Sequence, residues 1–416
     1  MEMSMKNMNR REVIELVAKA TASLVVATQI PIAMGMSKSP PYGGYSGHPD
    51  YPYLTKPATV FDFGLTPDQE ARAAELHKNI IVFDGLMECS IFPNLVPLLK
   101  QGGATSGNLS IGISGISSFT PDNVIKPEDW WTWRVLEADL KALPKVVNDF
   151  PDAVITLNHA DILAAKKAGK VGMMPGTQNT QFLGRDTSYL KKAYDMGLRI
   201  IQLTYNPTNF VGSGSLEKVD ARYGLSTLGE RVVEEMNALG MLIDTGHCSP
   251  ETMIKAAEVS TKPIAISHAG MISKVNQFRA TSDKALKTVA DKGGVYGVIS
   301  TPAAIAGSDR CTVNDYLDNI EYAINMVGVE HVGFGSDFIQ PATFEQILTA
   351  PAWDPKIAAS IGSFDVWPWS DGHVGWENGS AYPNMTRGLI KRGYSDSDIA
   401  KIMGGNFMRV IKDTIG

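Results

Sequence analysis

Short runs of β-branched residues alternate with helical patterns along most of this chain, and this alternation constrains the fold more than any other feature. The alternation is typical of βαβ units, in which each strand of a parallel sheet is followed by a helix. The strands are predicted at 79–84, 154–157, 171–175, 199–204, 241–244, 263–267, 294–299 and 331–336.

Eight such strands with intervening helices are what a closed (β/α)8 (TIM) barrel requires. A doubly wound open sheet more often carries a Gly-rich phosphate loop after its first strand, and none follows residues 79–84. The sequence therefore predicts one barrel over residues 76–416. Its helices are predicted at 130–150, from 161 onward, and at 188–196, 228–239, 250–259, 283–290, 314–326, 384–391 and 395–411, the last two closing the C-terminus.

The N-terminus carries the pair Arg10-Arg11 before a modest apolar stretch at 24–36. Gln29 and Pro31 interrupt that stretch, which is too short and too broken to span a bilayer. The pattern resembles a twin-arginine export signal, so residues 1–36 predict a periplasmic or secreted protein. The alternative is an amphipathic helix with a chance Arg-Arg pair in a cytoplasmic protein. An irregular lead-in, rich in Pro, Gly and Tyr, is predicted at 37–75.

Charge and cysteine content exclude some kinds of partner and site. The 416-residue chain has a formal net charge of -6 and shows no basic stripe, so no nucleic-acid partner is predicted. Its three cysteines form no CxxC pair, which argues against a disulfide framework or a structural zinc site. The fold must therefore be held by burial of apolar side chains, and the chain is long enough for that.

Polar residues follow several of the predicted strands, where barrel enzymes place their catalytic groups. His247 and His268 follow adjacent strands, and Asp337 ends the last one. Neutral imidazole on a rigid strand end is a good metal ligand. These positions predict a metal site at the C-terminal face of the barrel.

The same stretches resemble the signature of the renal (membrane) dipeptidase family. The resemblance runs from Leu76 to the C-terminus, with the motifs in family order and spacing, and indicates a divergent, bacterial-type member. It rests on Ile243–Ser249 (IDTGHCS), Ile266–His268 (ISH), Arg279, Val332–Asp337 (VGFGSD), and the connecting stretches 197–206, 224–237 and 393–406.

That family consists of (β/α)8 zinc hydrolases that cleave dipeptides and some related amides, with two zinc ions sharing a carboxylate. The resemblance assigns His247 and His268 to one ion. It assigns Arg279 to the substrate carboxylate, which suits a guanidinium fork. Asp337 then handles the proton of the attacking water and leaving amine. Tyr205 stands where the family has a histidine beside the substrate carbonyl, and with Asn206 it is expected to contact the substrate.

The first metal position departs from the family pattern. Leu86-Met87-Glu88 replaces the family's His-x-Asp pair, and Gln178 replaces the bridging glutamate. Leucine cannot ligate a metal, whereas Glu88 could, and a neutral amide bridges two cations poorly. Without anionic ligands two close divalent ions repel each other. The expected cofactor is therefore one zinc ion on His247 and His268, completed by Glu88, Gln178, Asp337 or water, with no metal as the alternative.

The predicted function is metal-dependent hydrolysis of a small peptide or amide with a free carboxylate. One alternative is a catalytically altered member that binds or matures a peptide-like metabolite without hydrolysis. Another is a metal-independent acid–base enzyme that uses Glu88 and Asp337. Two further points stay open: whether His373, in the loop after the last strand, replaces a lost ligand, and whether the chain forms a homodimer.

Overall fold

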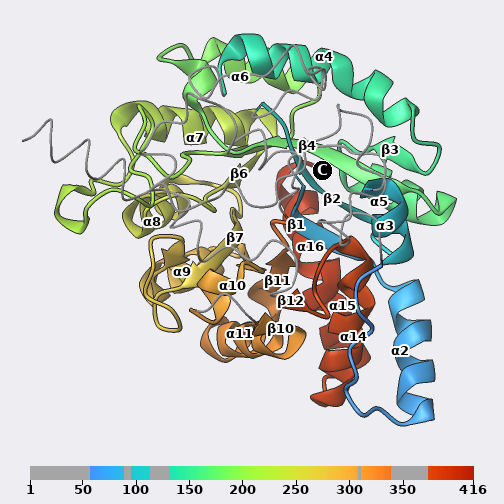
Figure 1. Ribbon diagram of the computed structural model, residues 1–416. Coiled ribbons are helices and arrows are strands. Elements are labelled where there is room, and N and C mark those ends of the chain that lie inside the picture. The colour runs from blue at the N-terminus through green and yellow to red at the C-terminus, as the bar shows by residue number, and fades with distance from the viewer. Residues whose placement is uncertain (1–56, 89–94, 113–130, 308–310, 339–372) are drawn as a thin grey trace, which may run out of the picture. The chain divides into compact units, whose positions relative to one another are not determined.

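A computed structural model describes residues 57–88, 95–112, 131–307, 311–338 and 373–416, all within one compact unit, Tyr45–Gly416. In these residues eight parallel strands pair in the order β1-β2-β4-β5-β6-β7-β9-β11, surrounded by helices (Figure 1). The strands are β1 (Phe83–Glu88), β2 (Ser106–Ser110), β4 (Val171–Thr177), β5 (Ile200–Gln202), β6 (Leu242–Asp244), β7 (Ala265–Met271), β9 (Val295–Ile299) and β11 (Val332–Gly335).

The ring closes between β11 and β1, which are not joined by a backbone ladder in the described part of the chain. The residues just after β11 close it instead. The Asp337 amide donates to Leu86 O at 2.9 Å, and the Ser336 amide donates to Asp84 Oδ1 at 2.8 Å. The predicted (β/α)8 barrel is thus confirmed as a nearly closed ring of parallel strands.

Helices follow the strands much as the sequence predicts, and serine caps begin several of them. Ser226, Ser249 and Ser282 each accept a hydrogen bond from the amide three residues on, which satisfies an otherwise unpaired N–H. The helices are α2 (Pro67–Asn79), α3 (Leu95–Gln101), α4 (Trp133–Asn148), α5 (His159–Ala168), α6 (Ser188–Asp195), α7 (Thr227–Leu239), α8 (Pro250–Val259), α9 (Asp283–Asp291), α10 (Pro302–Ile305), α11 (Val313–Val327), α14 (Tyr382–Lys391), α15 (Asp396–Ala400) and α16 (Asn406–Thr414).

Short elements complete the described chain. They are β3 (Ala153–Ile155), β8 (Ala280–Thr281), β10 (Cys311–Thr312), β12 (His373–Val374), the 3-10 turns η4 (Gln181–Leu183), η5 (Val219–Ala221), η6 (Val329–His331) and η8 (Gly379–Ala381), and the π turn η9 (Lys401–Gly405). None of the helices in the described ranges is long and apolar enough to cross a membrane.

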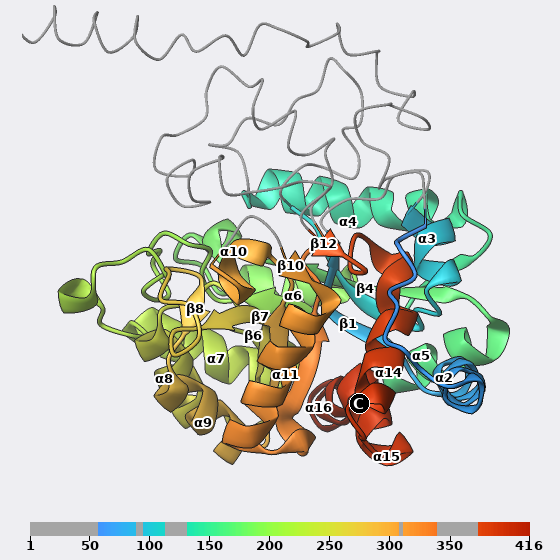
Figure 2. The ribbon, with the colours of Figure 1, turned by 60° about the horizontal axis from the view of Figure 1, so that its bottom comes forward.

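The last helix, α16, closes the N-terminal end of the barrel. One buried cluster joins its residues Phe407, Met408, Val410 and Ile411 to apolar side chains from the strands. Those side chains include the first residue of five strands, namely Phe83, Ile200, Leu242, Ala265 and Val295. In Figure 1 α16 lies within the ring of strands, and in Figure 2 it lies toward the lower end of the molecule. This end is filled with apolar side chains, so a site must lie at the opposite end.

One predicted strand lies outside the ring, and one strand of the ring was not predicted. The second predicted strand, 154–157, corresponds to β3, which pairs only with β4 and lies outside the ring. The second barrel strand is β2, in a stretch predicted as a loop. Its five residues, Ser-Gly-Asn-Leu-Ser, are all buried yet mostly small or polar, so they lack the apolar run by which a buried strand is recognised.

Two boundaries near the N-terminus also differ from the prediction. β1 begins at Phe83 and extends to Glu88, later than the predicted 79–84, because residue 79 ends α2 and 80–82 connect the two elements. α2 begins at Pro67, inside the predicted irregular segment 37–75, with a capping box from Thr66 and Gln69. The predicted export segment, 1–36, lies outside the described residues.

Candidate functional site

His247 and His268 meet at the C-terminal end of the barrel. His247 follows β6 and His268 lies within β7, so neighbouring strands hold the two rings. Their Nε2 atoms are 2.9 Å apart, and the ring planes are inclined at 66°. Both side chains are buried. The structure thus brings together the two histidines that the sequence predicts as a pair.

The outer nitrogens of both rings have polar partners, and these partners favour a proton on each Nδ1. Asn206 Oδ1 is 2.6 Å from His247 Nδ1 and accepts its proton. Ser267 Oγ donates to Asp244 Oδ2 at 2.6 Å, so it accepts from His268 Nδ1 at 2.7 Å. Both rings are therefore Nδ1–H tautomers, and each Nε2 directs a bare lone pair at the other. Metal-binding histidines have this arrangement, with the outer N–H bonded to a neighbouring acceptor.

Burial keeps both imidazoles neutral. The pKa of each histidine lies well below its usual value, chiefly because burial disfavours the charged ring and also because the Arg279 guanidinium is near. Two facing lone pairs 2.9 Å apart repel each other unless a cation or an N–H donor lies between them. The pair is thus suited to hold a cation without first losing protons.

Gln178, directly after β4, completes a triangle with the two rings. Its amide nitrogen lies 3.4 Å from His247 Nε2 and 3.3 Å from His268 Nε2. A tetrahedral zinc ion with bonds of about 2.0–2.1 Å separates its ligands by about 3.3 Å. Rotation of the amide by half a turn would direct its oxygen, a metal ligand, to the same point, and the two amide orientations are hard to tell apart. Two sides of the triangle match this separation, and the third, between the two Nε2 atoms, is shorter at 2.9 Å, so a single ion would need the two rings to move slightly apart.

A bulge in β7 and three glycines let His268 reach the barrel interior. The register of β7 against β9 shifts between Ile266 and Ala269, which turns Ser267 and His268 inward. A Cβ atom added to Gly297 or Gly335 would lie 2.0 or 2.1 Å from Ser267 O, and one on Gly85 would lie 2.6 Å away. Only glycine fits opposite the bulge from these three strands.

Arg279 and Asp337 flank the histidines. Arg279 directly precedes β8, which pairs with the end of β7. Its Nη1 donates to Gly246 O at 2.6 Å, and its Nη2 donates to His268 O at 3.4 Å. Asp337 Oδ2 is 3.9 Å from His268 Nε2. Burial raises the pKa of Asp337 to about 6, partly offset by the Arg279 charge. A carboxyl group with this pKa can both accept and return a proton near neutral pH.

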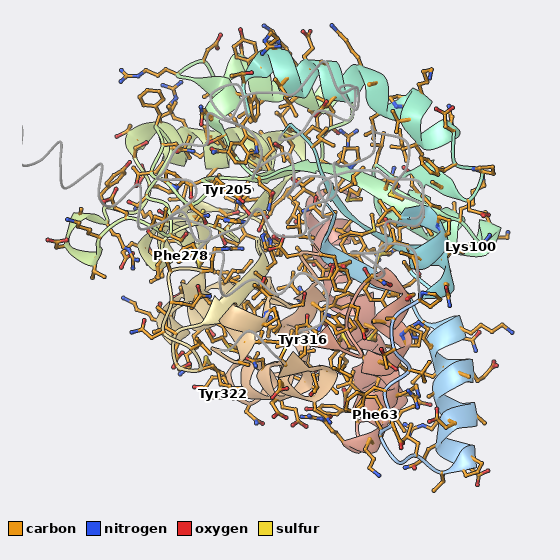
Figure 3. The ribbon with its side chains drawn as sticks, viewed as in Figure 1. Phe63, Lys100, Tyr205, Phe278, Tyr316 and Tyr322 are labelled. Carbon is orange, nitrogen blue, oxygen red and sulfur yellow. The ribbon has the colours of Figure 1, made fainter. Side chains whose placement is uncertain are left out.

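An aromatic stack borders the histidine pair on one side. Tyr205, labelled in Figure 3, follows β5, and its ring stacks on His247 with a centroid distance of 4.0 Å. Trp131 packs against Tyr205, with the two ring centroids 4.6 Å apart. Asn206 is buried, and its side-chain oxygen contacts His247 and Ser215. The contact with His247 lets Asn206 orient that ring, and the predicted contact of Asn206 with the substrate stays a prediction.

The first metal position of the family does not fit an ion in the described residues. Leu86 is fully buried there, and Glu88 is the last residue of β1, with its side chain outside the described part. No group of three or more His, Cys, Asp or Glu side chains that could hold a metal occurs among the described residues. A single ion on His247 and His268 therefore needs an amide, water or substrate oxygen. His373 forms β12 with its backbone, and its side chain too lies outside the description.

Sequence reasoning missed the groups that hold the site residues in place. Asp244 bonds to Ser267, the residue directly before His268. Asp84 bonds in the same way to Ser336, the residue directly before Asp337. An available signal was that each serine directly precedes a candidate site residue.

The comparisons with known proteins agree with this geometry. The profile of the membrane dipeptidase family (peptidase family M19) matches residues 112–358 and 362–415. The chain belongs to the membrane dipeptidase family.

Among its relatives, Dipeptidase tcpJ of Claviceps purpurea (strain 20.1) is 26% identical over 274 residues, which cover 65% of this chain and 58% of tcpJ. An amidohydrolase of Pseudomonas aeruginosa is 28% identical, with a TM-score of 0.69 over 83% of this chain and 99% of that chain. The probable dipeptidase PvdM of the same organism, 24% identical, has a TM-score of 0.66 over 84% and 99%. At 24% identity, the likeness to PvdM concerns the fold alone. The match covers only 58% of tcpJ, so tcpJ extends well beyond the part that resembles this chain.

Proposed function

We propose that this dipeptidase-family chain hydrolyses a peptide or amide bond in a small substrate that ends in a carboxylate, with one zinc ion on His247 and His268. The observation that carries the proposal is the pair of buried Nε2 atoms 2.9 Å apart, with a polar partner at each Nδ1. A zinc ion at that point would lower the pKa of water to about 7, enough for attack on a carbonyl.

The chain's own residues supply the rest of the reaction. Asp337 takes a proton from the attacking water as the C–O bond forms, and returns it to the amine nitrogen as the C–N bond breaks. Tyr205 donates a hydrogen bond to the carbonyl oxygen as negative charge develops there. Arg279 attracts the substrate carboxylate and keeps Asp337 partly ionised.

Zinc content and hydrolysis test this proposal together. Zinc per chain is measured by mass spectrometry on protein purified without chelator, and amine release is followed over a panel of dipeptides. We expect about one zinc per chain and zinc-dependent cleavage in the wild type, and loss of both in His268→Ala. The control is His159→Ala, since His159 begins α5 on the outside of the barrel. Full turnover in His268→Ala, or two zinc ions per chain, would contradict the proposal.

A second candidate is a member that binds a peptide-like metabolite without cleaving it. Gln178 favours it, because its amide can donate one proton to each Nε2 and thereby fill the place of the cation. Tight binding of a dipeptide that is never cleaved, with no zinc uptake, would identify this function.

We also propose that the protein is exported to the periplasm, which the pair Arg10-Arg11 supports. The test is to look for the protein in the periplasmic fraction, and we expect Arg10→Lys/Arg11→Lys to abolish its appearance there.

A further inference from the structure

Two buried aspartates make the same set of contacts in different parts of the barrel. Asp244 Oδ1 accepts from the amides of Ser267 and Gly246, and its Oδ2 accepts from the Ser267 hydroxyl. Asp84 Oδ1 accepts from the amides of Ser336 and Leu86, and its Oδ2 accepts from the Ser336 hydroxyl. In each case one carboxylate binds the amide two residues on and both donors of a serine on the neighbouring strand. We call these groups the Asp84 clamp (Asp84, Ser336) and the Asp244 clamp (Asp244, Ser267).

Both clamps lie where the barrel has fewest backbone bonds. β6 pairs with β7 through the single register pair Asp244 and Ala265. β11 and β1 have no ladder in the described residues. Between β6 and β7, and between β11 and β1, a carboxylate oxygen accepts the hydrogen bond of a backbone amide that would otherwise bond to a strand carbonyl. The carboxylate thus joins two strands at the point where they diverge toward the site.

The residue after each clamped serine is one of the groups that meet in the site. His268 follows Ser267 and Asp337 follows Ser336, and their side chains are 3.9 Å apart. Ser267 also accepts the His268 Nδ1 proton, so the Asp244 clamp fixes both the ring and its tautomer. Asp337 has a φ of 50°, a left-handed conformation unusual for a residue with a side chain. Its neighbours must therefore hold it in place.

We propose that Asp84 and Asp244 are paired positioning residues, each aligning the group that follows its serine: Asp337 for proton transfer and His268 for the metal. This proposal rests on the proposed function, but it predicts different effects for two chemically identical substitutions. Asp→Asn leaves one acceptor oxygen and replaces the other with an NH2 donor, so in both clamps the serine hydroxyl can no longer donate its proton to this side chain.

The test compares Asp244→Asn and Asp84→Asn in zinc affinity, measured by competition with a chromogenic chelator, and in kcat and KM for a cleaved dipeptide. In Asp244→Asn we expect zinc affinity to fall ten- to a hundredfold, as when other groups that orient a ligand are lost. In Asp84→Asn we expect unchanged zinc affinity, a kcat at least about tenfold lower, and a KM within about twofold of wild type.

Tyr382→Phe is the matched control for stability. Tyr382, on α14, donates to Asp84 Oδ2 at 2.6 Å, so its loss weakens the packing around Asp84 while both bonds to Ser336 remain. We expect a lower melting temperature with zinc affinity and kcat within about twofold of wild type. Should either aspartate variant fail to fold, Ser336→Ala and Ser267→Ala, which remove only the hydroxyl, provide the same comparison.

The outcomes separate this proposal from the proposed function. Two results would overturn the positioning roles in a wild-type protein that takes up zinc. In one, both aspartate variants lose zinc affinity and kcat to the same extent, and in the other, both change only in melting temperature. A wild-type protein that cleaves no dipeptide but binds zinc would contradict the hydrolase alone, and the difference in zinc affinity between the variants would still decide the Asp244 clamp. Wild-type protein without zinc uptake would refute both.

Discussion

Gln178 is the residue that most distinguishes this site from the family pattern. A carboxylate is expected at its position, and an amide cannot offset the charge of a divalent ion. The neighbouring imidazoles are neutral and Asp337 is 3.9 Å from His268, so an ion here would be held with little anionic support. This balance predicts a weaker affinity for zinc than a carboxylate ligand would give.

Gln178→Glu should therefore raise the zinc affinity of the protein about tenfold or more. The new carboxylate would lie within reach of both Nε2 atoms, while Leu86 would still keep a second ion from binding. Zinc titration against a chelator measures the change. Gln181→Glu is the control, because Gln181 carries the same side chain in an exposed position three residues away. Equal affinities for wild type and Gln178→Glu would show that Gln178 does not face the ion.

Asp337 should set the acidic limb of the activity profile. Its pKa is raised to about 6 by burial, and only the ionised carboxylate can accept a proton from water. We expect kcat/KM to be constant above pH 7 and to fall about tenfold per pH unit below about pH 6. Asp337→Asn should lower kcat about a hundredfold or more and abolish this limb. A limb that persists unchanged in Asp337→Asn would assign it to another group.

At the scale of elements, the strands with apolar or β-branched runs could be predicted from the sequence, and β2 could not. β5, β6, β9 and β11 have such runs, because their side chains pack between sheet and helices. β2 instead buries the polar side chains Asn108 and Ser110, where a buried strand more often carries valine or isoleucine. The two histidines could be predicted from their strand ends, but the bulge that turns His268 inward could not, because bulges depend on the opposing strands.

Gly297→Ala should damage the site through β7. Its new methyl group would lie 2.0 Å from Ser267 O, so β7 would have to move outward with His268. We expect a loss of about 1–3 kcal/mol in the free energy of unfolding and a weaker affinity for zinc. Gly270→Ala, whose nearest contact would be 3.1 Å, is the comparison and should have a smaller effect on both. The measurements are denaturant unfolding and zinc titration, and unchanged zinc affinity in Gly297→Ala would contradict the role of the bulge.

At the scale of the whole molecule, His77 joins three segments that are distant in the sequence. It lies on α2, and its ring contacts Gly102 O at 2.8 Å, after α3, and Thr386 Oγ1 at 2.7 Å, on α14. Burial lowers the pKa of His77, partly offset by the bond to Gly102. The folded protein therefore keeps this ring neutral at a pH where the unfolded chain has already bound a proton.

The sign of the resulting pH dependence follows from linkage. Below the ordinary histidine pKa of about 6.5 the unfolded state binds more protons than the folded state, so acid lowers stability. The contribution of His77 between pH 7.5 and pH 5.5 has an upper limit of about 1.4 kcal/mol, which applies to a ring that stays neutral in the folded state throughout this range. The raised pKa values of Asp84 and Asp337 act in the opposite direction.

These two groups are the same in wild type and His77→Gln, so a comparison of the two proteins isolates His77. The glutamine amide can still donate to Gly102 O but does not titrate, so the variant should lose less stability than the wild type over this range. Denaturant unfolding at the two pH values measures this, with the partly exposed His159→Gln expected to follow the wild type. Parallel losses in wild type and His77→Gln would mean that the acid sensitivity arises elsewhere in the barrel.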